Sequence, residues 1–184
     1  MGKRFLTIIG GCLVFICAMA IICSAEELTL QLVKDKVNAA VKLFEREGEA
    51  AYPKFKDVNG EFRFANGEGY VWIHSLSGIM AMHATKPSME GMNQLDYMDS
   101  SGFFFFQAMN ELVEKKGEGW VIYLWAKPGL NKKEELKSSF VKIAINKGQQ
   151  YVVGCGLYGV TMEQIKAKFP NDIVCDAEMF NKGI

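Results

Sequence analysis

Histidine is scarce in this chain of 184 residues: His74 and His83 are the only two. Neither histidine has a second ligand at the three- or four-residue spacing that a helical zinc motif shows. Asp96 and Asp99 likewise lack the regular spacing of oxygen ligands that a calcium loop requires. The sequence therefore predicts no metal ion and no other cofactor.

An excess of charge of either sign is also lacking. The chain has 21 lysine and arginine residues against 21 aspartate and glutamate residues. Lys3 and Arg4 fall within the first 25 residues, so the remainder is slightly acidic. This balance gives no reason to expect nucleic acid as a partner.

Motifs of common enzymes are missing as well. No serine lies in a G-x-S-x-G elbow and no two cysteines form C-x-x-C, so hydrolase and thiol-redox chemistry have no support. Segment 154–159, GCGLYG, fits G-x-G-x-x-G and is followed by Asp176, which imitates a dinucleotide site locally. Too few residues follow Asp176 for the further strands and helices of a dinucleotide fold. We therefore expect a protein that is not an enzyme.

The N-terminal 25 residues have the composition of a targeting segment. Lys3 and Arg4 precede an apolar run at 5–22, and Cys23-Ser24-Ala25 offers small residues for signal peptidase. We interpret residues 1–25 as a signal peptide, with an uncleaved N-terminal anchor as the alternative, because the run is close to the minimum for crossing a bilayer. The predicted protein is exported, and is periplasmic or secreted unless this segment anchors it to the membrane.

Two cysteines remain once this segment is set aside. Cys12, Cys17 and Cys23 lie within it, which leaves Cys155 and Cys175 in residues 26–184. An even number of cysteines in an oxidising compartment favours a Cys155–Cys175 disulfide. The alternative is a pair of small buried hydrophobic residues.

The first half of residues 26–184 reads as a long helix followed by a strand hairpin. Leu30, Val33, Val37, Val41 and Phe44 recur at helical spacing, which predicts a helix from Glu27 to about Ala51 with one buried stripe. Strands are expected at 69–74 and 79–83, joined at Ser77-Gly78.

The second half predicts a helix and three further strands. Asp99 or Ser100 is expected to cap a helix through Phe103 to Val113 that stops at Gly117. Strands follow at 119–127, 135–146 and 150–158, and Thr161 to Gln164 has the pattern of a capping box for a last short helix. This order indicates one α+β domain at 26–184 with an antiparallel sheet of about five to six strands and an inserted helix.

The ordered motifs resemble a known family. Segment VWI at 71–73, Gly78 before IMAMH, Gly91, Asp96, Asp99, Gly102, GEGWVIYLWAKPG, KSSF and GCGLYG together resemble the single Cache domain, a bacterial extracytoplasmic sensor module. The resemblance covers roughly Leu30 to Gly159. It implies a long N-terminal helix packed on a PAS-like antiparallel sheet that holds a small ligand.

This sequence departs from the family pattern at two places. His83 is followed by Ala84 where the family commonly has proline, and Phe140 stands where a tyrosine is common. The second departure removes a hydroxyl that could bind a ligand.

Several residues have the chemistry that a small organic carboxylate needs, namely donors for the carboxylate and an apolar wall for the carbon chain. The candidate donors are Lys137, Tyr123, Trp125 and His83. The candidate wall residues are Tyr70, Trp72, Met80, Met82, Phe104 and, on the strand of Lys137, Phe140. Each of these aromatic residues could instead be ordinary core, and Lys137 a solvated lysine.

We therefore predict an extracytoplasmic domain that binds and senses a small molecule, such as a small organic carboxylate, without catalysis. Since no output segment follows in the chain, we expect the signal to pass to a separate partner such as a membrane receptor or a transporter. Two alternatives stay open: an anchored structural or protein-interaction module, and an enzyme that uses His83 as a base.

Overall fold

The computed structural model describes residues 28–129 and 133–184. The predicted signal peptide or anchor at 1–25 lies outside the described residues. The helices are α1 (Leu30–Glu47), α2 (Tyr52–Lys56), α3 (Phe105–Lys116), α4 (Met162–Lys168) and α5 (Ala177–Lys182), with short 3-10 turns η1 (Gly48–Ala51), η2 (Ala65–Gly67) and η3 (Pro87–Met89). The strands are β1 (Arg63–Phe64), β2 (Gly69–Ser75), β3 (Met80–His83), β4 (Glu118–Ala126), β5 (Glu134–Asn146), β6 (Gln149–Tyr158) and β7 (Val174–Cys175).

Helix α1 forms where the spacing of apolar residues predicts it. The Thr29 hydroxyl accepts a hydrogen bond from the Leu32 amide at 3.1 Å and caps the first turn. Val33, Val37 and Phe44 are buried along one stripe. The helix ends at Gly48, whose φ of 58° lies in the left-handed region that favours glycine. The observed helix is a few residues shorter at each end than the predicted one.

A mixed sheet forms the centre of the domain. Its strand order is β1-β2-β6-β5-β4-β7, and β3 pairs with β2. Every pairing is antiparallel except that of β4 with β7, which is parallel. The predicted antiparallel sheet of five to six strands is thus confirmed in its central strands, and β1 and β7 are added at its edges. Each of these edge strands is two residues long, too short to show alternation in the sequence.

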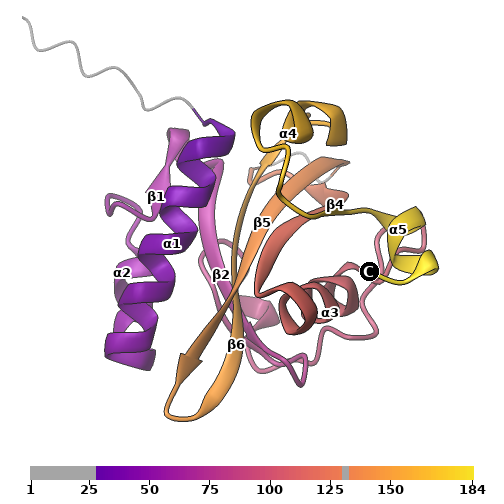
Figure 1. Ribbon diagram of the computed structural model, residues 1–184. Coiled ribbons are helices and arrows are strands. Elements are labelled where there is room, and N and C mark those ends of the chain that lie inside the picture. Colours follow the sequence, from indigo (N-terminus) through magenta and orange to yellow (C-terminus); the bar gives the residue numbers. More distant parts are fainter. Residues whose placement is uncertain (1–27, 130–132) are drawn as a thin grey trace, which may run out of the picture.

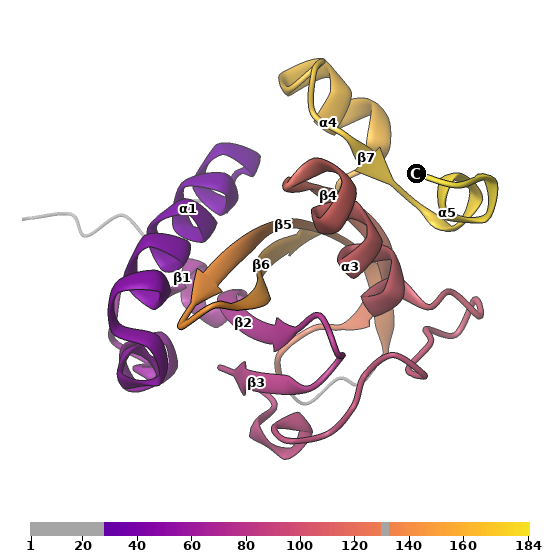
Figure 2. The ribbon, with the colours of Figure 1, turned by 60° about the horizontal axis from the view of Figure 1, so that its bottom comes forward.

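Helices cover both faces of this sheet (Figures 1 and 2), with α1 on one face and α3 on the other. Because side chains alternate along a strand, neighbouring residues belong to different cores. On β2, Val71 and Ile73 join the core beneath α1, whereas Tyr70 and Trp72 join the core beneath α3. The site described below lies within the α3 core.

Helix α3 begins later than predicted and without a side-chain cap. Its N-terminal boundary residue, Phe104, makes no capping bond. Asp99, a predicted cap, instead accepts hydrogen bonds from the amides of Ser101, Phe103 and Leu124. The Asp99 carboxylate therefore links the loop before α3 to β4. It does not cap α3, because its hydrogen bonds are made with the loop and β4 and it lies too far before Phe105 in the chain.

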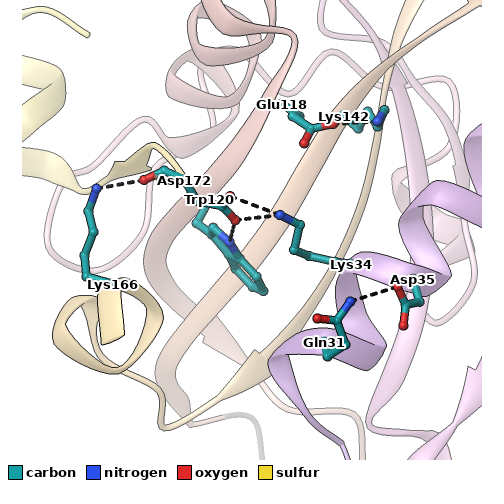
Figure 3. Close-up of polar contacts among 8 residues, drawn as sticks. All are labelled: Gln31, Lys34, Asp35, Glu118, Trp120, Lys142, Lys166 and Asp172. Carbon is teal, nitrogen blue, oxygen red and sulfur yellow. Dashed lines mark hydrogen bonds and ion pairs between the residues drawn. The ribbon is translucent and has the colours of Figure 1, made fainter. Parts of the chain in front are cut away.

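The C-terminal segment is bound back to α1 (Figure 3). Asp172 forms an ion pair with Lys34 of α1 at 2.8 Å and accepts a hydrogen bond from Trp120 Nε1 on β4 at 2.9 Å.

The predicted capping box is present at α4, where Thr161 and Gln164 bond reciprocally.

The predicted disulfide is wrong in this fold. Cys155 and Cys175 are both buried free thiols. Cys155 lies on β6 and Cys175 on β7, and strands β5 and β4 separate them. At about 4.8 Å for each strand step, the two residues are roughly 14 Å apart, whereas a disulfide needs Cα atoms within about 7 Å. The thiols act as small core residues, the alternative that the sequence left open.

Candidate ligand-binding site

A buried lysine lies at the centre of the α3 core. Lys137 on β5 is 1% exposed, and its Nζ donates a hydrogen bond to the Tyr70 hydroxyl at 2.7 Å. Three rings surround this ammonium group, with centroids at 4.2 Å for Tyr70, 5.2 Å for Trp72 and 5.3 Å for Tyr158. Gly156 makes room for the lysine, because a Cβ atom there would lie 2.8 Å from Lys137 Cε.

This ammonium group has no carboxylate partner in the part of the chain that the structure describes. Within 28–129 and 133–184, no carboxylate forms an ion pair with Lys137, and the Tyr70 hydroxyl is its one hydrogen-bond acceptor. A lysine ammonium has three N–H donors, and burying it without an opposite charge is costly. The arrangement is therefore complementary to an anion.

Tyr70 is held by two donors. Trp125 Nε1 also donates to the Tyr70 hydroxyl, at 3.0 Å. Burial alone would raise the pKa of Tyr70, but the charge and hydrogen bond of Lys137, together with the Tyr158 hydroxyl and Trp125 Nε1, outweigh burial and hold the pKa below its usual value. Tyr70 thus fixes both the lysine and the tryptophan in place.

His83 forms an adjoining wall as a neutral ring. Its Nδ1 accepts hydrogen bonds from the amides of Thr85 at 3.2 Å and Lys86 at 3.0 Å. Burial, with the nearby charges of Lys137 and Lys86, holds the pKa of His83 well below its ordinary value of 6.5. The proton of the neutral ring must therefore be on Nε2, and this N–H has no acceptor in the part of the chain that the structure describes.

Trp72 adds another donor to the same wall. It pairs with His83 across β2 and β3, and its buried Nε1 has no hydrogen-bond partner among the described residues. The ring lies directly over Gly154, where a Cβ atom would meet Trp72 Cζ2 at 2.2 Å. Glycine is needed at this position because any side chain would displace the indole.

A positively charged cleft borders Trp125, whose Nε1 donates to Tyr70. The cleft has a volume of about 740 Å³, and its charged lining residues are Arg63, Lys86, Lys127 and Glu134. Trp125 forms part of its wall, with Lys86 Nζ 3.6 Å from the ring centroid. Half-burial lowers the pKa of Lys86. Because Trp125 borders both the cleft and the Tyr70 hydroxyl, it separates solvent from Lys137.

Most of the predicted site residues come together on this side of the sheet. Tyr70, Trp72, Met80, Tyr123 and Trp125 belong to the α3 core, and Lys137 and His83 contact its rings. Tyr123 contributes as a structural neighbour: its hydroxyl bonds with Ser139 at 3.0 Å and its ring stacks on Phe105 at 4.2 Å.

Three predicted site residues lie elsewhere. Phe140 and Met82 belong to the core beneath α1, on the opposite face. An odd spacing along a strand reverses the face, so Phe140 cannot share a wall with Lys137; Met82 pairs with Ile73 and shares its face. Phe104 precedes α3 and lines a small pocket of about 100 Å³ with Ala177 and Phe180.

The predicted site residues did not include Arg63, Lys86 or Tyr158. Tyr158 could have been found, because alternation along β6 places it on the same face as Gly154 and Gly156, and it pairs with Lys137. Arg63 and Lys86 lie on a two-residue strand and in a loop, where no periodic pattern marks them.

A second cleft lies at the other end of β2. It measures about 650 Å³ and is lined by residues such as Tyr52, Ser75 and Tyr151, with Glu49 as its charged lining residue. It lacks a buried cation, so the Lys137 site is the better candidate for an anion. Nor do three or more histidine, cysteine, aspartate or glutamate side chains gather as a metal site in the described ranges.

Known proteins share this fold. A family model described as a Cache domain matches residues 25–173. A periplasmic sensor domain of a chemotaxis protein is 31% identical, with a TM-score of 0.57 over 71% of this chain and 94% of that chain. A Cache chemosensory domain studied for carboxylic acid recognition is 29% identical, with a TM-score of 0.57 over 72% and 91%. A methyl-accepting chemotaxis protein from Vibrio parahaemolyticus is 25% identical, with a TM-score of 0.56 over 70% and 86%. The family model and the first of these structures establish that this chain belongs to the Cache domain family.

Proposed function

We propose that this domain binds a small organic carboxylate at Lys137 and senses it without chemical change. The observation that carries the proposal is the buried Lys137 ammonium, which has one hydrogen bond to Tyr70 and no acidic partner among the described residues. A carboxylate would supply the missing charge and accept the remaining N–H donors. The rings of Tyr70 and Trp72 would contact its carbon chain.

The cleft supports the same ligand class. Arg63, Lys86 and Lys127 outnumber Glu134 along its lining, which favours the approach of an anion. Lys86 lies over the Trp125 ring and has no ion pair or side-chain hydrogen bond within the described ranges. Movement of this half-buried side chain would open the way past Trp125 to Lys137. The solved relative studied for carboxylic acid recognition adds support by family likeness.

His83 supports binding over catalysis. Its Nδ1 is occupied by two backbone N–H donors, and its pKa lies well below neutrality. A general base needs a free lone pair and a pKa near the working pH. His83 would instead present Nε2–H to the ligand as a neutral donor.

We propose that the domain works outside the cytoplasm and passes its signal to another protein. Residues 1–25 would act as the export signal or as an anchor, and 26–184 as the sensor domain. As far as the structure describes residues 28–184, none of their helices has the length and apolarity to span a bilayer. A membrane receptor or a transporter is the partner that this arrangement would serve.

Calorimetric titration of the purified protein with two- to four-carbon carboxylates, together with a thermal-shift screen, tests the proposal. A ligand that binds the native state raises its thermal stability. Lys137→Met should weaken the affinity about 100-fold, because it removes a charge-assisted contact. Lys142→Met is the matched control: Lys142 lies on the same strand and pairs with Glu118 at the surface, so its loss should leave the affinity unchanged. Equal affinities in both variants would remove Lys137 from the site. A protein that binds no acid but captures one tight protein partner would favour an interaction module.

A further inference from the structure

The aromatic wall of the second cleft, of about 650 Å³, lies on the α1 side of the sheet. Tyr52 and Tyr151 line this cleft and pack against the core beneath α1. Ser75 is paired with Tyr151 across β2 and β6, so the two side chains share this face. Lys137 belongs to the opposite face, and the two sites are therefore separate.

Phe44 holds the two tyrosine rings at nearly a right angle to each other. The Tyr52 ring is parallel to the Phe44 ring within 8°, with centroids 6.0 Å apart. The Tyr151 ring is inclined at 82° to Phe44, with centroids 4.9 Å apart. The faces of aromatic rings carry partial negative charge. A cation in the corner between Tyr52 and Tyr151 would therefore be attracted by two rings at once.

Glu49 gives this aromatic corner a negative charge. Its side chain is exposed on the lining of the cleft, and lysine, arginine and histidine do not line it in the described ranges. Burial and the charge of Glu49 raise the pKa of Tyr52, because the carboxylate lies close to the phenol. The lining therefore disfavours an anion.

The lysines around Glu49 do not form ion pairs with it. Lys54 of α2 pairs with Glu47 at 2.7 Å. Lys147 lines an adjoining cleft of about 290 Å³, and no ion pair joins it to Glu49 within the described residues. The charge of Glu49 is thus available to a ligand.

Other acceptors near the rings are engaged within the protein. The Ser75 and Ser77 hydroxyls share a hydrogen bond at 2.7 Å, and Gln149 Oε1 accepts one from the Tyr151 hydroxyl at 2.8 Å. A primary ammonium group has three N–H donors to satisfy. A fully methylated ammonium group has none, so it suits a lining that offers ring faces and a single carboxylate.

We propose that this cleft is a second binding site, which takes a small organic cation with a methylated ammonium group between Tyr52 and Tyr151. Aromatic rings with a nearby carboxylate match the spread positive charge of such a group. The inference does not depend on the carboxylate site at Lys137, so either proposal can fail without the other.

Choline and the uncharged alcohol in which carbon replaces its nitrogen are probes of the same shape. By calorimetry at pH 7, choline should bind about 10-fold more tightly, the expected effect of two ring contacts and one exposed carboxylate. Tyr151→Leu keeps an apolar side chain without the ring face, so it should lower the ratio of choline to alcohol affinity about threefold.

Glu49→Gln tests the charge, with Glu114→Gln as its matched control. The first change should weaken choline binding about threefold, as expected for an exposed charge pair. Glu114 is an exposed residue of α3, on the other side of the sheet, so the same loss of charge there should leave the affinity unchanged. Equal affinities for choline and the alcohol, no binding of choline, or equal effects of the two substitutions would overturn the inference and leave the carboxylate site standing.

An NMR measurement on the wild type stands even if Tyr151→Leu does not fold. Nuclear Overhauser effects should connect the N-methyl protons of bound choline with the ring protons of Tyr52 and Tyr151. Contacts with Tyr97 and Trp125 instead, which line the other large cleft, would contradict the inference.

Discussion

Lys137 Nζ lies 2.7 Å from the hydroxyl oxygen of Tyr70, and each residue is 1% exposed. The pair joins β5 to β2, although β6 lies between these strands. Gly156 of β6 allows the contact, because the lysine side chain crosses over it. The core of the domain thus contains a lysine side chain.

The first prediction concerns the stability of the ligand-free protein. Lys137→Met should leave the free energy of unfolding unchanged or raise it by about 1–3 kcal/mol, because an apolar side chain of similar volume replaces an uncompensated buried charge. Lys142→Met should cost less than about 1 kcal/mol, as expected for a surface ion pair. Urea denaturation at pH 7 measures both. A loss of more than 2 kcal/mol in Lys137→Met would mean that the lysine is structural.

The second prediction concerns the pH dependence of binding. His83 has a pKa well below 6.5 because it is buried near Lys137 and Lys86. It should stay neutral between pH 6 and 8, so the affinity for a carboxylate should change less than about twofold over this range. Titration calorimetry at several pH values checks this. A tenfold tighter affinity at pH 6 would show that His83 gains a proton in the site.

The third prediction concerns acid stability. Burial lowers the pKa of His74 from 6.5 to about 4, although its hydrogen bond to Asn110 opposes the shift. Below pH 6.5 the unfolded chain takes up a proton that the folded state refuses, so stability is complete above this pH and falls as the pH drops toward 4. The loss from His74 is on the order of 3 kcal/mol.

His74→Gln separates this contribution from other titrations. Between pH 7.5 and pH 4.5 the variant should lose less stability than the wild type, measured by urea unfolding at each pH. His83 acts in the same direction and remains in both proteins. Parallel stability curves for the two proteins would contradict the assignment to His74.

The fourth prediction concerns the thiols. Burial raises the pKa of Cys155 to about 11 and that of Cys175 to about 12. Both should therefore resist iodoacetamide at pH 8 in the folded protein and react fully in denaturant without a reducing agent. Peptide mass spectrometry distinguishes these states. A linked Cys155–Cys175 peptide from fresh protein would contradict the strand order.

Local sequence patterns predicted much of the fold. The apolar stripe of α1, the aromatic and β-branched residues of β2 and the capping box of α4 are each local features of a few residues, so the sequence alone reveals them. The family and the α+β class were predicted from such patterns, and the family model and the observed fold confirm both. The predicted start of α3 was wrong because the Asp99 carboxylate accepts a hydrogen bond from Leu124 of β4, and a local sequence pattern does not reveal such a distant partner.

The sequence by itself determined the order of helices and strands, and the strand faces on which Tyr70, Trp72 and Lys137 fall, because alternation is a property of each strand alone. Only the tertiary structure decided that Phe140 and Met82 face α1, that Cys155 and Cys175 lie apart, and that Lys137 is buried with no carboxylate partner among the described residues. Those outcomes depend on strand order, pairing register and the helices packed on each face. They arise from contacts between residues far apart in the chain, and the position of a buried charge relative to its neighbours is set by those contacts.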